Sequence, residues 1–165
     1  MASYHHPQTM PLEERHLTAA QGYLDLGLFI EANDELEQMD ADVRHLPEVL
    51  EVRLGIYRAL EKWELVEVVA RKLAQYDPQE PRWRIEWSHA SKLRGNTDAA
   101  RLILVDGIKL TSGSGELYFA LACLEATAGN IGAAKEALHS AIKATPELKK
   151  RSLDEPALEK LWESM

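Results

Sequence analysis

Residues 115–148 read GELYFALACLEATAGNIGAAKEALHSAIKATPEL. Two segments with apolar residues at helical spacing flank Gly129-Asn130, a pair typical of the turn that ends a helix. The second segment stops at Thr145-Pro146, because proline cannot continue a helix. The stretch therefore predicts a hairpin of two helices.

The same pattern recurs along the chain at a constant interval, which separates Gly95 from Gly129. We call this interval the repeat step. Gly27 falls on the same series, with Glu61 in the remaining place. Three further series hold only small or apolar residues, namely Ala32, Val66, Ala100 and Ala134, then Leu36, Ala70, Leu104 and Leu138, then Met39, Leu73, Gly107 and Ala141. We predict a flexible leader at 1–12, four repeats at 13–46, 47–80, 81–114 and 115–148, and a C-terminal capping segment at 149–165.

These residues resemble the tetratricopeptide repeat (TPR) family. Its pattern places a small residue and an aromatic in the first helix, glycine at the turn, alanine early in the second helix and proline at the end. The first repeat matches it with Ala20, Tyr23, Gly27, Ala32 and Leu36. The resemblance implies an all-α fold, a right-handed α-solenoid of about nine helices, in which stacked hairpins share their apolar faces.

The C-terminal segment predicts a capping helix over the fourth repeat. Asp154-Glu155-Pro156 is a typical helix start. An apolar face at helical spacing is formed by Leu153, Ala157, Leu158, Leu161 and Trp162.

Composition disfavours several classes of function. The chain has 165 residues with 27 acidic against 19 basic side chains, a formal net charge of -8 that opposes binding to nucleic acid or an anionic membrane. A lone cysteine, Cys123, allows no internal disulfide and suits a reducing compartment. No apolar run approaches the length of a membrane span, and no secretory signal opens the chain. We expect a cytoplasmic protein with neither a cofactor nor a metal.

The TPR resemblance implies that certain positions of each first helix face a concave groove. Charge divides unevenly, since residues 1–46 hold nine acids and two bases while residues 81–114 hold three acids and six bases. We expect Trp83 and Trp87 to pack in the core and Phe119 to be exposed beside Ile85. The candidate groove residues are Leu17, Gln21, Arg58, Arg82, Ile85, His89, Lys92, Phe119 and Cys123.

The sequence favours a non-catalytic module that binds a protein or peptide in this groove. Arg58, Arg82, His89 and Lys92 would supply polar contacts and suit an acidic segment. One alternative is a scaffold that self-associates or binds through its convex face. Another is a thiol-dependent enzyme, because His89 and Cys123 are one repeat step apart and therefore occupy equivalent places on successive first helices. The partner and the oligomeric state stay open at this stage.

Overall fold

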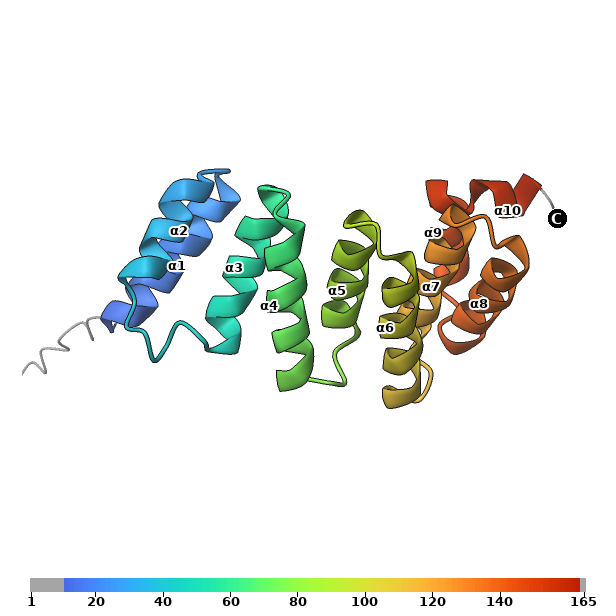
Figure 1. The fold of residues 1–165 in the computed structure, drawn as a ribbon, viewed down its shortest axis with the longest axis horizontal. Helices are drawn as coiled ribbons and strands as arrows, with labels where there is room; N and C mark the ends of the chain where they lie inside the picture. Colours follow the sequence, from blue (N-terminus) through green and yellow to red (C-terminus); the bar gives the residue numbers. More distant parts are fainter. Residues whose placement is uncertain (1–10, 164–165) are drawn as a thin grey trace, which may run out of the picture. The chain divides into compact units, whose positions relative to one another are not determined.

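The computed structural model describes residues 11–163, which form an all-α helical repeat without strands (Figure 1). None of these helices exceeds 14 residues, so none is long and apolar enough to cross a bilayer. The elements are α1 (Leu12–Asp25), α2 (Phe29–Gln38), α3 (Pro47–Ala59), α4 (Trp63–Tyr76), α5 (Pro81–Leu93), α6 (Thr97–Leu110), α7 (Gly115–Thr127), α8 (Ile131–Ala144), α9 (Leu148–Leu153), the 3-10 turn η1 (Pro156–Leu158) and α10 (Glu159–Glu163).

Eight of these helices, α1 to α8, correspond in pairs to the four predicted repeats, with α1 beginning one residue before the first. The predicted leader lies mostly outside the described residues, and its last residue, Leu12, is the first residue of α1. The chain divides into two compact units between Glu61 and Lys62, at the turn between α3 and α4. Because this division runs through the second repeat, the two units are described separately.

The N-terminal unit contains α1, α2 and α3, which all contact one another. The two helices of the first hairpin and the first helix of the second repeat bury one shared cluster. Its fully or nearly fully buried members are Ala20, Ala32, Leu36, Met39, Val49, Val52 and Ile56. The small alanines on α1 and α2 let the two helices approach closely, while the larger side chains of α3 fill the space between them.

In the C-terminal unit the helices from α4 to α8 contact their successors in chain order. Leu104 of α6 packs with Leu117 and Leu124 of α7 in one cluster. A second cluster joins α7 and α8 to the C-terminal segment, with Ala122, Leu138 and Leu158 among its buried members. Each first helix thus packs between neighbours on both sides, as stacked hairpins require.

The turns within the hairpins place one residue in the left-handed region of φ. Gly27, Gly95 and Gly129 have φ of 76°, 85° and 84°, and Glu61 takes the equivalent place with φ of 54°. At Gly129 the glycine N–H donates to the Ala126 carbonyl and the next N–H, of Asn130, donates to the Glu125 carbonyl, the paired bonds of a Schellman motif. The second repeat therefore keeps the turn geometry without its glycine.

The C-terminal segment corrects the prediction of a single capping helix. It consists of α9, η1 and α10, and Asp154 and Glu155 lie between α9 and η1. Leu158 and Leu161 are fully buried against α7 and α8, but Leu153 is 60% exposed. Pro156 explains the break, because its ring and missing N–H prevent α9 from continuing through it. Residues 164 and 165 of the predicted cap lie outside the described part of the chain.

Substituting Glu61 tests the cost of its left-handed backbone. We expect Glu61→Gly to raise the free energy of unfolding by about 0.5 to 1 kcal/mol, since glycine adopts positive φ without a Cβ clash. Urea denaturation followed by circular dichroism measures the change. Glu61→Ala is the matched control, because it removes the same side chain beyond Cβ but keeps the clash. An equal gain in both variants would show that the backbone conformation is not the cause.

Candidate functional site

Seven of the nine candidate groove residues implied by the TPR resemblance line two pockets, one within each compact unit. The N-terminal pocket is open, with a volume of about 570 Å³, and lies between α1 and α3. Leu17 and Gln21, both candidate residues, line it. The remaining lining residues are Thr18, Gly22, Asp25, Glu48, Glu51 and Val52. The Gln21 amide donates to Asp25 Oδ1 at 2.8 Å. The carboxylates of Asp25, Glu48 and Glu51 make this pocket acidic.

The C-terminal pocket has a volume of about 270 Å³ and lies between α5, α7 and the C-terminal segment. It brings together five candidate residues that are far apart in the sequence, namely Ile85, His89, Lys92, Phe119 and Cys123. The other lining residues are Ser88, Leu104, Glu116, Ala120, Leu124, Arg151, Glu155 and Ala157. We refer to it below as the α5–α7 pocket. It combines apolar walls with side chains of both charges.

Phe119 lines this pocket, but the expectation that its ring would be exposed is wrong. Only 3% of the residue is accessible, because the guanidinium of Arg151 lies over the ring with Cζ 4.6 Å from its centroid. Arg151 is held there by an ion pair from Nη1 to Glu116 Oε2 at 2.8 Å. The C-terminal segment, which supplies Arg151, therefore replaces an apolar shelf with a cationic surface.

The remaining candidate cations do not line either of these pockets. The exposed Arg82 places its guanidinium over the Trp83 ring, 3.9 Å from the centroid, and Trp83 is buried as predicted. Arg58 is exposed near the end of α3 and belongs to the N-terminal unit. Within the C-terminal unit, Lys92 and Arg151 are the cations that reach the pocket, with His89 beside them.

His89 and Cys123 both line the α5–α7 pocket, yet their surroundings oppose thiolate chemistry. Burial, with a further contribution from the negative charge of Glu155, raises the pKa of the Cys123 thiol to about 12. The rings of His89 and Trp63 form a T-shaped pair, with centroids 5.9 Å apart and the planes perpendicular. The thiol is therefore protonated near neutral pH, whereas a catalytic cysteine needs a lowered pKa. Within residues 11–163, no group of three or more His, Cys, Asp or Glu side chains is placed to bind a metal.

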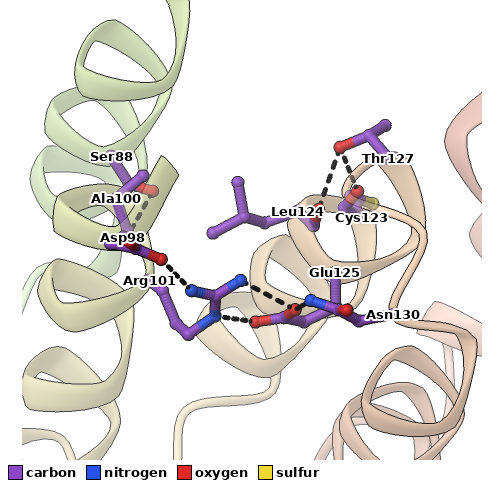
Figure 2. A network of polar contacts seen from close by, with 9 residues as sticks. All are labelled: Ser88, Asp98, Ala100, Arg101, Cys123, Leu124, Glu125, Thr127 and Asn130. Carbon is purple, nitrogen blue, oxygen red and sulfur yellow. Dashed lines mark hydrogen bonds and ion pairs between the residues drawn. The ribbon is translucent and has the colours of Figure 1, made fainter. Parts of the chain in front are cut away.

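A buried polar network on α7 was not anticipated from the sequence (Figure 2). Glu125, whose side chain is 5% exposed, accepts hydrogen bonds from Nε and Nη2 of Arg101 on α6. Asn130, at the start of α8, donates to Glu125 Oε2 at 2.6 Å, and Asp98 accepts from Arg101 Nη1 at 2.6 Å. The hydrogen bonds from Arg101 hold the pKa of Glu125 below its usual value. The network joins three successive helices.

A second polar link occupies the equivalent place one repeat earlier. Ser91 of α5 donates to Glu67 Oε1 of α4 at 2.9 Å, and Arg94 also pairs with Glu67. Both links span 24 residues, from a second helix to the next first helix. Ser91 and Glu125 fall on the same repeat series as Tyr23 and Tyr57. This switch from aromatic to polar residues was the available signal for a buried polar contact.

Solved structures of helical repeat proteins resemble this chain. A MamA structure (MamA MSR-1) has a TM-score of 0.62 at 24% identity over 89% of this chain and 82% of its own. TTC0263, a thermophilic TPR protein of Thermus thermophilus, has a TM-score of 0.66 at 22% identity over 92% of this chain and 82% of its own. A chain of the APC/C hetero-tetramer Cut9–Hcn1 has a TM-score of 0.64 at 18% identity, covering 92% of this chain and 29% of its own.

These similarities confirm the predicted fold, a TPR-type helical repeat. At such identities they establish the fold alone. No protein-family model matches the sequence, and no curated protein matches it.

Replacing Arg101 tests the network around Glu125. We expect Arg101→Met to lower the free energy of unfolding by about 2 kcal/mol at pH 7, because it leaves a buried carboxylate without its cation. Since the folded-state pKa of Glu125 is lowered, the ion pair stabilises the fold above the usual pKa of 4.5, and the contribution is lost as pH falls through the lowered value. Urea denaturation at a series of pH values measures both effects.

The control adds Glu125→Gln to the Arg101→Met background, which removes the stranded charge. This double variant should recover part of the lost stability. If Arg101→Met lowers the free energy of unfolding by the same amount whether position 125 is glutamate or glutamine, Arg101 and Glu125 are not coupled.

Alkylation of Cys123 tests the surroundings of the thiol. With a pKa near 12, we expect the folded chain to react with iodoacetamide at pH 8 at least about a hundredfold more slowly than a free thiol. The rate should rise steadily through alkaline pH, and the urea-unfolded chain should react at the ordinary rate. A fast reaction with an inflection near pH 7 would instead support the thiol-dependent enzyme.

Proposed function

We propose that the chain is a non-catalytic protein-interaction module that binds an acidic peptide or extended protein segment in the α5–α7 pocket. The observation that supports this most is the gathering of Ile85, Lys92 and Ala120 from two successive first helices around one cavity. Concave surfaces of helical repeats are suited to extended ligands, because equivalent positions recur along them. The structural similarity to TPR proteins agrees with a scaffold of this general kind.

The dimensions of the pocket favour a segment of chain over a large cofactor. A volume of about 270 Å³ lies just below the usual range for small-molecule sites, so it suits one or two side chains of a longer ligand. Ile85, Ala120 and Leu124 form apolar walls for such side chains. The remainder of the bound segment would extend over the surrounding surface.

Two cations, Lys92 and Arg151, line the pocket together with the acids Glu116 and Glu155, and the cations are the groups that would contact a ligand carboxylate. Lys92 is partly exposed and takes part in no ion pair within residues 11–163. Arg151 is paired with Glu116, but the two side chains are 56% and 43% exposed, and an exposed pair of this kind contributes only about 0 to 1 kcal/mol. A ligand carboxylate can therefore replace Glu116 at little cost while Arg151 stays over Phe119.

The N-terminal pocket differs in charge and does not suit the same ligand. Asp25, Glu48 and Glu51 would repel an acidic segment. The proposed site is therefore in the C-terminal unit alone, and Leu17 and Gln21 are not part of it. The raised pKa of Cys123 opposes the alternative of a thiol-dependent enzyme centred on that residue.

Charge reversal at Lys92 tests this function. The probes are fluorescein-labelled synthetic peptides that alternate glutamate with leucine, and a parallel set with lysine in place of glutamate. We expect fluorescence anisotropy to show binding of the acidic set, and Lys92→Glu to weaken it by about tenfold or more through direct repulsion. Lys143→Glu, an exposed position on α8 with the same change of charge, is the matched control.

Binding of the acidic set that is equal in the Lys92→Glu and Lys143→Glu variants would contradict the proposed site. A preference for the lysine-containing set would contradict the proposed ligand class.

A further inference from the structure

Exposed hydrophobic side chains of the C-terminal unit concentrate on the two helices α4 and α6. In the described part of this unit, seven large hydrophobic residues are markedly exposed, and five of them belong to these helices. They are Leu65, Val68, Tyr76, Leu102 and Leu110, with exposed fractions between 39% and 63%. Isolated exposed hydrophobics are common on proteins, but such a concentration indicates a contact surface.

These residues follow the repeat period. The repeat step pairs Leu65 with Ala99, Val68 with Leu102, Lys72 with Asp106 and Tyr76 with Leu110. On each helix the four members are spaced by three or four residues and so share one face. We call these eight positions the outer stripe. At three of its four places both helices carry a hydrophobic residue. At the fourth place α4 carries Lys72 and α6 carries Asp106, which have opposite charges.

The most deeply buried residues of the same helices lie away from the stripe, and Val69 and Ile103, at 7% and 8% exposure, adjoin its edge. Val66, Ala70 and Leu73 of α4 are buried, as are Ala100 and Leu104 of α6. Core packing therefore does not account for the hydrophobic outer stripe. The first and fourth repeats carry acidic residues, Asp34 and Glu136, at the place of Val68 and Leu102. The outer stripe is thus confined to the second and third repeats.

We propose that the outer stripe is the contact surface for a second copy of this chain. A two-fold axis parallel to the helices would place α4 of one copy on α6 of the other. Each stripe residue of one copy would then contact, in the other copy, the residue one repeat step away from it. Lys72 of each copy would face Asp106 of the other, with Val68 and Leu102 in apolar contact beside this pair. Asp106 also pairs with Lys109 of its own helix, with Nζ 3.7 Å from Oδ1, and this exposed pair is weak enough for Lys72 of the second copy to replace. The opposite charges at equivalent places make the surface complementary to itself.

The size of the outer stripe sets the expected strength of the dimer. Residues 65 to 76 rise about 17 Å along the helix axis, so two helices from each copy form a small interface. We expect association in the micromolar range, detectable by sedimentation equilibrium across a series of protein concentrations. The α5–α7 pocket shares no residue with the outer stripe, so this proposal and peptide binding can fail independently.

Charge reversals provide a sharp test. Lys72→Asp creates two aspartates facing each other at both symmetric contacts, and Asp106→Lys creates two lysines. We expect each variant alone to dimerise at least about tenfold more weakly than the unaltered chain. Mixed in equal amounts, the two variants restore both contacts with opposite charges, and we expect a heterodimer of the original strength.

Lys143→Asp is the matched control, since it changes the same charge on α8, outside the outer stripe. Circular dichroism of each variant shows whether it is folded, and the double variant Lys72→Asp with Asp106→Lys should dimerise again. A chain that stays monomeric at high micromolar concentration would overturn the proposal and leave the outer stripe to a different protein. Dimerisation that is unchanged by either reversal would also overturn it.

Discussion

A single helical hairpin cannot bury its apolar face by itself, and the fold depends on this constraint. Each first helix must pack between the preceding and following helices. In the C-terminal unit α5 contacts both α4 and α6, and α7 contacts both α6 and α8. The end of the array needs a different solution, which the C-terminal segment supplies by burying Leu158 and Leu161 against α7 and α8. Removing a neighbour would expose the face that it covers.

Polar contacts at the helix junctions add specificity to this apolar stacking. Ser91 and Glu125 stand at places where the first and second repeats carry tyrosine, and each bonds to the helix before it. A buried ion pair often gives little net stability compared with a hydrophobic contact, but it is costly to break. Glu125 bonds to Arg101 and Asn130 together, so a helix displaced from its register would leave a buried carboxylate unsatisfied.

Periodicity allowed the helices and the turns within the hairpins to be predicted from the sequence. The TPR resemblance implied the groove positions, of which Arg58 and Arg82 line neither pocket. Contacts outside the period could not be found in this way, because they depend on tertiary packing. Arg151 covers Phe119 only because the C-terminal segment breaks and packs on α7. Within the repeats, the pattern gives the direction of the Cα–Cβ bond but not the position of a charge. The guanidinium of Arg82 therefore packs on the adjacent ring of Trp83 and does not line the pocket. Lys92, in contrast, reaches the pocket.

The two proposed surfaces share no residue, and this separation has a functional consequence. The α5–α7 pocket is lined mainly by the first helices α5 and α7 and by the C-terminal segment, whereas the outer stripe lies on the second helices α4 and α6. A dimer formed through the outer stripe would therefore leave one peptide pocket open on each copy. A partner with two acidic segments could then bind both, because the second binding event becomes intramolecular at an effective concentration of roughly millimolar. Weak pockets of about 270 Å³ would in this way support tight binding of a bivalent partner.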